Sequence, residues 1–284
     1  MAVKYFQSQL DYKNLLDTIV RPDSRWLDIG CGCNVIPPWI RGSVDFQRDL
    51  IGRCEIAVGC DPIDGRPHEA GLEKFVGDCS VLPYPSGFFN LATANMVAEH
   101  VSDPLAFTRE VHRVLSPRGR LVLHTPNLHN PSIFLANLLP NKLVSIIAKQ
   151  MDGRTDEDIF PAYYRMNTRK ALASLPGFRV VSLRCVRTGP LLRKVAVLRE
   201  AESILLNRAS HRFFRNLQAD WIAVFERLPE DQTDPRSLPE SDEGRSVMAE
   251  RPHRRFSFAA FAKISRAFSG PLAPSTRHGK TAHD

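Results

Sequence analysis

The sequence lacks the features that mark a secreted or membrane-spanning protein. Its first residues contain no apolar signal-peptide core. No later run reaches the roughly 18 apolar residues that a membrane-spanning helix needs. The closest approach, residues 133–148, is interrupted by Pro140, Asn141 and Lys142. These absences predict a cytoplasmic protein.

Cysteine is present, but without the spacing of a disulfide framework or a metal centre. Six cysteines are scattered along the 284 residues. Four of them fall in or beside predicted buried strands, which favours reduced thiols. Cys31 and Cys33 are two positions apart, with no second pair of Cys or His at the distance of a zinc site. We therefore expect no metal.

Charge is unevenly distributed over a net value of +7. Acidic residues dominate positions 230–250 and basic residues dominate 251–284. Together with the Pro and Ser content, this predicts a disordered, charged tail over 229–284, in which residues 254–268 can form a short basic amphipathic helix. The apolar fraction of 43% is sufficient for one large folded domain over residues 1–228.

Short apolar runs alternate with helical or polar segments, which is typical of βαβ units and a parallel sheet. Apolar spacing predicts a helix over 5–19, and Asp103 is placed to cap another over 104–115. A shorter helix is predicted to end at 172–175. The predicted strands cover residues 25–29, 55–60, 74–76, 90–95, 120–125, 178–186 and 220–227.

Two segments in the second half have more than one interpretation. Residues 132–149 are apolar and predicted helical, and 191–217 are predicted to form a long basic amphipathic helix. The stretch 133–148 is a candidate lid over a ligand pocket or an interfacial helix that touches a membrane. We favour core packing for both helices over either of these roles.

The strongest motif is a glycine turn after the first predicted strand, Trp26-Leu27-Asp28-Ile29-Gly30-Cys31-Gly32-Cys33-Asn34. Glycines let the backbone approach a ligand closely. A dinucleotide fingerprint would place a third glycine where Val35 stands, and the Gly-Lys-Ser/Thr of a P-loop is absent. The carboxylate of Asp28 would repel a pyrophosphate but suits a cationic sulfonium or amino group.

This run resembles the D-x-G-x-G-x-G motif of class I S-adenosylmethionine-dependent methyltransferases, with Asn34 in place of the third glycine. Asparagine tolerates the left-handed backbone angles that such a position can require. The resemblance implies an α/β fold: a doubly wound, Rossmann-like, seven-stranded and mostly parallel sheet with helices on both faces and the last strand antiparallel. It also implies S-adenosyl-L-methionine as cofactor.

Further strand ends match that family in order. Asp61 resembles the acid that holds the ribose hydroxyls, and Asp78 resembles the acid at the adenine amino group. Asn90 replaces the usual Asp before the fourth strand. A plain structural turn or helix capping is the alternative explanation for the glycines and the two acids. The expected cofactor-binding residues are Asp28, Gly30, Cys31, Gly32, Asp61, Pro62, Asp78, Cys79 and Asn95.

The block from Asn95 to Val101, continued at Thr125-Pro126-Asn127, resembles a bacterial subfamily that includes quinone, sugar and natural-product methyltransferases. His100 is a candidate general base there, with a structural role as the alternative. His124 ends the fifth strand, where alternation can bury it or aim it at substrate. The insert 128–167 is expected to shape the acceptor pocket, with Tyr163, Tyr164 and Arg165 in contact with substrate.

The favoured activity is O-methylation of a small molecule or saccharide, free or lipid-linked, with peripheral contact to the inner membrane face in the lipid-linked case. A quinone-type lipid ring is the second choice. The basic composition invites nucleic-acid methylation, but Asn95-Met96-Val97-Ala98 stands where a base-flipping tetrad would follow strand four. A non-catalytic interaction module is the remaining alternative, and the complete glycine turn and acids argue against it.

Overall fold

The computed structural model describes residues 7–63, 67–130, 161–186, 204 and 220–229. The chain divides into two units, Met1–Glu240 and Ser241–Asp284, and every described residue belongs to the first. The predicted tail over 229–284 and its helix at 254–268 lie outside the described residues, apart from position 229. No helix in the described part is both long and apolar enough to cross a membrane.

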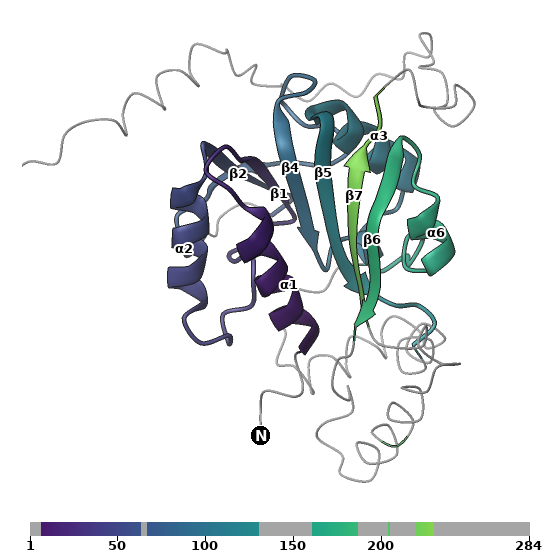
Figure 1. Cartoon of the computed structure of the whole chain (residues 1–284), viewed down its shortest axis with the longest axis horizontal. Helices are drawn as coiled ribbons and strands as arrows, with labels where there is room; N and C mark the ends of the chain where they lie inside the picture. The colour runs from purple at the N-terminus through teal and green to yellow at the C-terminus, as the bar shows by residue number, and fades with distance from the viewer. Residues whose placement is uncertain (1–6, 64–66, 131–160, 187–203, 205–219, 230–284) are drawn as a thin grey trace, which may run out of the picture. The chain divides into compact units, whose positions relative to one another are not determined.

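A seven-stranded sheet forms the centre of the described unit (Figure 1). Its order is β3-β2-β1-β4-β5-β7-β6. The strands from β3 to β5 pair in parallel, whereas β7 is antiparallel to both β5 and β6. The strands are β1 (Arg25–Ile29), β2 (Ile56–Asp61), β3 (Glu73–Val76), β4 (Phe89–Asn95), β5 (Leu115–Pro126), β6 (Phe178–Val186) and β7 (Asp220–Arg227). This confirms the predicted fold.

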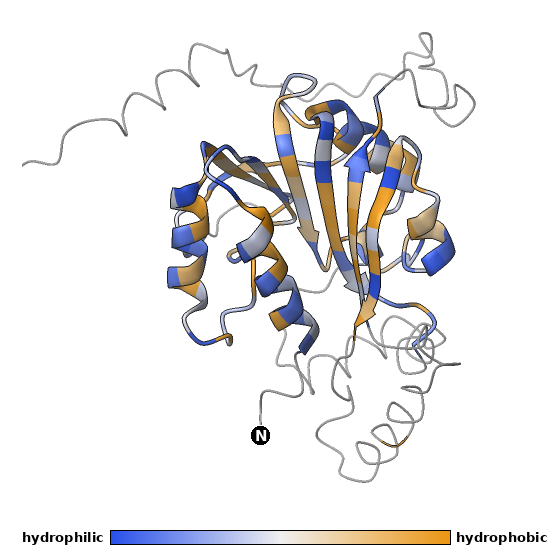
Figure 2. Cartoon of the chain, in the orientation of Figure 1, coloured by the Kyte–Doolittle hydropathy of each residue, from blue (hydrophilic) through white to orange (hydrophobic). Residues whose placement is uncertain are grey.

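Helices cover both faces of the sheet. On one face, α1 (Gln7–Ile19) and α2 (Ser43–Arg53) pack Tyr12, Leu16 and Leu50 against alternate residues of the central strands. On the other face, α3 (Pro104–Val114) and α6 (Arg169–Ala173) bury the intervening residues. Because both sides of β1, β4, β5 and β7 are covered, these strands are mostly hydrophobic in Figure 2.

Local sequence accounts for where several elements begin. Asp103 caps α3, since its Oδ1 accepts hydrogen bonds from the amides of Leu105 and Ala106 at 3.0 and 3.1 Å. Asn90 fastens the start of β4 to β1, because its Oδ1 accepts from the amide of Arg25 at 2.9 Å. Its amide nitrogen also donates to the carbonyl of Asp23, just before β1, at 2.8 Å, a bond that an ionised Asp at this position could not make.

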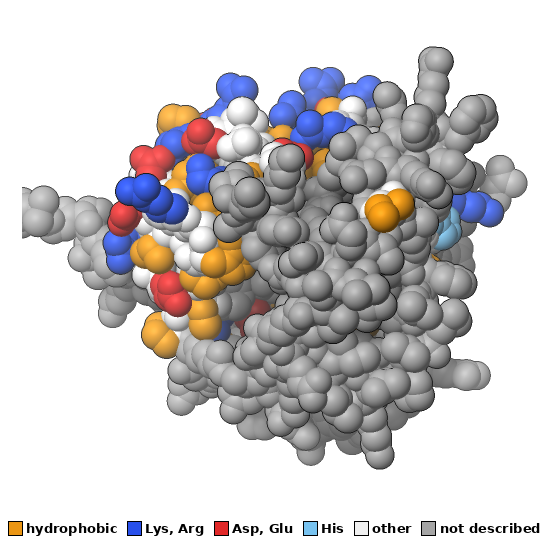
Figure 3. Space-filling model, turned by 90° about the horizontal axis from the view of Figure 1, so that it is seen from below, with side chains coloured by type: hydrophobic (Ala, Val, Ile, Leu, Met, Phe, Trp, Pro, Cys, Tyr) orange, Lys and Arg blue, Asp and Glu red, His pale blue; other side chains and the backbone are white. Residues whose placement is uncertain are grey.

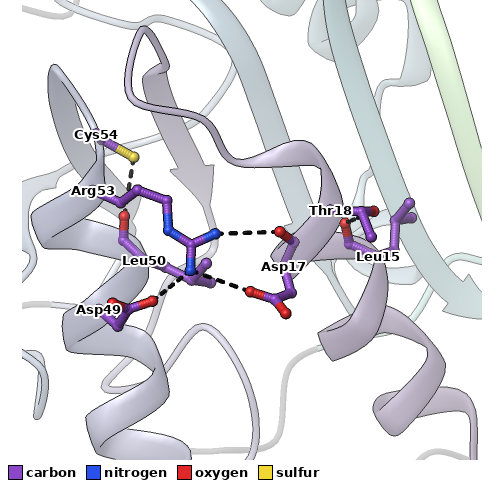
Figure 4. Close-up of polar contacts among 7 residues, drawn as sticks. All are labelled: Leu15, Asp17, Thr18, Asp49, Leu50, Arg53 and Cys54. Carbon is purple, nitrogen blue, oxygen red and sulfur yellow. Dashed lines mark hydrogen bonds and ion pairs between the residues drawn. The ribbon is translucent and has the colours of Figure 1, made fainter.

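The two helices on the first face are joined by an ion pair (Figure 4). Arg53 at the end of α2 lies 3.2 Å from Asp17 of α1 and also pairs with Asp49 one turn earlier in its own helix. The Arg53 side chain donates a further bond to the backbone carbonyl of Asp17 at 3.3 Å. All three side chains retain considerable exposure to solvent, so this link contributes little to stability.

The predicted elements compare closely with the observed ones, with one clear difference. The fifth strand was expected over 120–125, but β5 begins at Leu115, directly after α3. Leu115 pairs with Phe89 across a register shift, so Ser116 and Pro117 belong to the strand instead of a separate loop. The predicted helices over 132–149 and 191–217, apart from position 204, lie outside the described residues, as does most of the insert 128–167.

Candidate functional site

The glycine turn lies at the carboxyl edge of the sheet, between β1 and β2. Gly30 and Gly32 adopt positive φ angles of 66° and 50°, which L side chains rarely adopt. The amides of Gly30 and Cys31 both donate to the carbonyl of Cys60, at 2.7 and 3.2 Å. A Cβ built on Gly32 would meet nothing within 4 Å, so the backbone here faces open space that a ligand can occupy.

Asn34 does not adopt the left-handed angle that its place in the motif allows, since it is absent from the positive-φ residues. Its side-chain oxygen accepts instead from Nε2 of Gln47 on α2, at 3.2 Å. Oε1 of Gln47 also accepts from the amide of Val35 at 2.6 Å. The residue after the turn therefore serves to attach the turn to α2.

Asp61 is the acid at the end of β2, and it is 6% exposed. Its Oδ2 accepts from the amide of Gly32 at 2.8 Å, and its Oδ1 accepts from the amide of Ile63 at 2.9 Å. Each carboxylate oxygen can accept a further hydrogen bond. The arrangement fits a vicinal diol held beside the open space at Gly32, as the family resemblance expects for the cofactor ribose.

Asp28 is buried under α1 at the end of β1. Its carboxylate accepts a hydrogen bond from the Thr93 hydroxyl of β4, and the Trp26 indole donates to the same hydroxyl at 2.8 Å. Burial raises the pKa of Asp28 to about 7, the Thr93 bond opposes this, and the charge of Asp61 adds to it. A cation bound nearby would favour the ionised form.

The remaining predicted cofactor residues lie at the ends of β2 and β3. The amide of Gly77 donates to the carbonyl of Asp61 at 3.0 Å, which holds the two strand ends together. Pro62 and Asp78 are exposed, and Cys79 is half-buried. Burial raises the pKa of the Cys79 thiol to about 11, so the thiol is neutral near pH 7 and a poor nucleophile.

Asn95 at the end of β4 is engaged by other parts of the protein. Its amide nitrogen donates to Oε1 of Gln9 in α1 at 3.1 Å and to the carbonyl of Val35 at 3.0 Å. Its oxygen accepts from Nε2 of Gln9 at 3.2 Å and from Nδ1 of His124 at 2.8 Å. The side chain therefore joins α1, the glycine turn and β5 at one point.

His124 is completely buried. The Tyr12 ring of α1 stacks on its imidazole with 5.3 Å between centroids. Its Nε2 lies 3.6 Å from Oδ2 of Asp220 at the start of β7, a distance at which the protonated imidazole forms an ion pair. This geometry suits a side chain that holds α1 and the strand ends together.

The predicted acceptor-side residues are brought together around the short 3-10 helix η2 (Ala98–His100). The imidazole Nδ1 of His100 donates to the carbonyl of Pro161 at 2.9 Å. The amides of Tyr163 and Tyr164 both donate to the carbonyl of Glu99, at 2.7 and 3.1 Å. Arg165 donates to the carbonyl of Ser102, and the Tyr163 side chain is 46% exposed.

Figure 3 views the protein from below the orientation of Figure 1, toward the edge where the arrows of β4 and β6 end. Most of the Lys and Arg side chains visible among the described residues lie at the periphery of this view. Hydrophobic side chains make up more of the inner described surface.

Several residues of this region were not singled out from the sequence. Glu99 lies directly before His100 in the block that resembles the methyltransferase subfamily, and this position could have indicated a role in the site. The sequence around Gln9 and Asp220 contains no motif that marks them, because their contacts are with residues far away in the sequence. The polar residues that the structure adds to this edge are Gln9, Tyr12, Thr93, Glu99, Asn167 and Asp220.

The fold and the residues at the carboxyl edge of the sheet together define a class I S-adenosylmethionine-dependent methyltransferase. The sequence matches the methyltransferase domain family over residues 6–182, which is more than half of the chain. The protein therefore belongs to this family, and its cofactor is S-adenosyl-L-methionine. A methyltransferase of Methanosarcina mazei has the same fold, with a TM-score of 0.50 and 19% identity over 76% of this chain and 98% of that one.

Curated relatives are similar over shorter regions. Demethylmenaquinone methyltransferase of Chlamydia muridarum is 30% identical over 115 residues, covering 39% of this chain and 46% of the relative. Norajmaline N-methyltransferase of Rauvolfia serpentina is 29% identical over 145 residues, covering 50% of this chain and 49% of the relative. The chain thus spans about half the length of these relatives, which are named for different acceptors.

Proposed function

We propose that this methyltransferase acts on a hydroxyl group of a small molecule or saccharide, free or attached to a lipid. The observation that carries the cofactor half of the proposal is the carboxylate of Asp61, bonded to Gly32 beside the open space at the glycine turn. The acceptor half is supported by His100 and residues 163–165, which lie around the end of β4.

The chain's own residues divide the work of holding the cofactor. Asp61 accepts the ribose hydroxyls, Gly30 and Gly32 let the backbone approach, and Asp28 offers a buried negative charge toward the cationic end. Asp78 and Cys79, beside Pro62, border the adenine side. When bound, S-adenosyl-L-methionine supplies a sulfonium methyl group whose displacement returns the carbon–sulfur electron pair to sulfur.

On the acceptor side, His100 takes the proton that the hydroxyl must lose as its oxygen bonds to the methyl carbon. The bond from its Nδ1 to the Pro161 carbonyl fixes the tautomer, which assigns proton acceptance to Nε2. Tyr163, Tyr164 and Arg165 orient the acceptor. His124 contributes by holding α1 over the strand ends, which keeps water from this face of the sheet.

Isothermal titration with S-adenosyl-L-methionine and S-adenosyl-L-homocysteine tests the cofactor half. We expect binding by the wild-type protein and much weaker binding by Asp61→Ala. Incubation with tritiated cofactor and fractionated lysate tests the acceptor half, because the labelled product identifies the methylated atom. A label on carbon or nitrogen instead of oxygen would overturn the O-methylation proposal while leaving the methyltransferase assignment in place.

A quinone-type ring is the second candidate acceptor, favoured by the similarity to a demethylmenaquinone methyltransferase. Such a substrate resides in a lipid bilayer, and contact with a membrane would involve segments 133–148 and 191–217, which lie outside the described residues apart from position 204. Co-sedimentation with vesicles of anionic and neutral lipid distinguishes this case, since a saccharide acceptor in solution requires no binding to vesicles.

A further inference from the structure

Glu99 joins the end of β4 to the acceptor-side segment through its backbone. Its carbonyl accepts two hydrogen bonds, from the amides of Tyr163 and Tyr164. Tyr164 has a φ angle of 52°, a left-handed conformation that a bulky residue adopts only where its surroundings hold it. These two bonds are therefore a fixed attachment point for a segment that is distant in the sequence.

The side chain of Glu99 begins a second link to the same segment. Its Oε2 accepts from the Thr125 hydroxyl of β5 at 2.9 Å, and Oγ1 of Thr125 accepts from Nδ2 of Asn167 at 2.6 Å. The Asn167 amide also donates to the carbonyl of Pro126 at 3.0 Å. Thr125 and Asn167 are both fully buried, so water does not compete with this relay. One residue thus anchors both ends of the stretch 163–167.

Glu99 is also a buried acid close to the proposed base. The residue is 5% exposed, and its Oε1 lies 4.0 Å from Nε2 of His100. Among the residues that the structure describes, the other titratable groups that face it are His124 of β5 and Asp220 of β7. A carboxylate at this distance stabilises the imidazolium that forms when His100 accepts a proton.

We propose that Glu99 is a positioning residue for methyl transfer: it fastens residues 163–167 to the strand ends, and its ionised carboxylate stabilises protonated His100. This inference rests on the proposed function, because it assumes that His100 is the base. Glu99 acts through His100 and the acceptor-side segment, without contact to the reacting atoms. Burial raises the pKa of Glu99 to about 7, partly offset by its own amide and Thr125. Its charge is thus sensitive to pH in the neutral range.

The first test compares the wild type with Glu99→Gln, which has the same shape without the charge. Methyl transfer is followed with tritiated S-adenosyl-L-methionine and the lysate fraction that the wild type labels. We expect a fall in kcat of about 10- to 100-fold with little change in cofactor Kd. The wild-type kcat should rise as pH increases through about 7. Because His100 must itself be neutral to accept a proton, Glu99→Gln should keep a rise in kcat, but with its midpoint at lower pH, and the midpoint for Glu99→Asp should lie between the two.

Glu55→Gln is the matched control. Glu55 is exposed and lies just before β2, at the amino-terminal end of the strands, whereas Glu99 lies at their carboxyl end. The control variant should keep the wild-type kcat and pH profile. A Glu99→Gln protein with the wild-type kcat and pH profile would overturn the proposed role of the charge. Absence of any cofactor binding by the wild type would instead overturn the proposed function itself.

A second test needs no turnover. Hydrogen exchange at the amides of Tyr163 and Tyr164 reports the attachment of the segment directly. We expect exchange at least about tenfold faster in Glu99→Ala, where the relay through Thr125 is lost, and a smaller effect in Glu99→Gln. Equal protection in all three proteins would overturn the anchoring role, whatever the acceptor proves to be.

Discussion

The amide of Gly32 is hydrogen-bonded to Oδ2 of Asp61 at 2.8 Å, so the turn after β1 and the acid that ends β2 form one unit. The amide of Ile63 holds the other carboxylate oxygen. The carboxylate is thereby oriented before any ligand arrives. Such preorganisation reduces the entropy that a ligand must lose on binding.

Replacing Asp61 by Asn is expected to weaken binding of S-adenosyl-L-methionine by about tenfold or more. The amide group of Asn would direct an N–H donor at one of the two backbone donors, and it removes a charged hydrogen-bond acceptor. Calorimetric titration measures the effect. Asp45→Asn, an exposed change in the first turn of α2, should bind as the wild type does. Equal affinity in Asp61→Asn would contradict the role assigned to this acid.

Gly30→Ala should destabilise the turn and reduce cofactor binding. A Cβ at Gly30 would lie 2.3 Å from Cγ2 of Val97, and the φ angle of 66° strains any L residue. We expect a loss of about 1–3 kcal/mol in the free energy of unfolding. Denaturant titration gives this value.

The same denaturant titration of Gly52→Ala should show a change in the free energy of unfolding of the opposite sign. Gly52 lies within α2, and a Cβ there would meet nothing within 4 Å. Alanine should therefore raise the free energy of unfolding by about 0.5–1 kcal/mol, because it favours the helix. A Gly30→Ala protein at least as stable as the wild type would contradict the strain argument for Gly30.

The affinity for S-adenosyl-L-methionine should depend on pH through Asp28. Its pKa of about 7 means that the carboxyl is mostly protonated at pH 6 and mostly ionised at pH 8. A cationic ligand prefers the ionised form, so affinity should rise with pH by up to about tenfold per unit below 7 and level off above it. Titrations from pH 5.5 to 7.5 with the wild type and Asp28→Asn isolate this contribution, and parallel curves would exclude it.

Arg53→Ala should cost less than about 1 kcal/mol of stability, with the effect declining as salt is added. The Arg53 side chain is 30% exposed, and its partners Asp17 and Asp49 are more exposed. Figure 4 shows the contacts between them. Thermal unfolding at low and high ionic strength measures the difference. A loss of several kcal/mol would show that the link between α1 and α2 matters far more than its exposure implies.

Strands β1, β6 and β7 have the bounds predicted from the sequence, because each is an apolar run with polar or turn residues at both ends. The mostly parallel sheet with an antiparallel last strand, however, was expected from the family resemblance, and the order of the strands came only from the structure, since periodicity does not specify which strands pair. The start of β5 was misjudged for a physical reason. Pro117 and Gly119 favour a turn locally, but pairing of Leu115 with Phe89 extends the strand across them.

The cofactor side of the site was more predictable than the acceptor side. Gly30, Gly32 and Asp61 are adjacent to strand ends in a fixed motif, so local sequence places them. The contacts of Glu99 and His124 depend on residues from α1, β7 and the segment after Pro161, which sequence spacing does not bring together. Asn95 illustrates the limit: its position was predicted, but its bonds to Gln9 and Val35 were not.

The antiparallel β7 places both boundaries of residues 187–219 next to each other. Val186, the last residue of β6, is paired with Asp220, the first residue of β7. A connection between neighbouring points can change in length at a small entropic cost, because closure of a loop depends only weakly on its length. The stretch between Val186 and Asp220 can therefore differ in length without a change in the pairing of β6 with β7 or in the strand ends of β1 and β2.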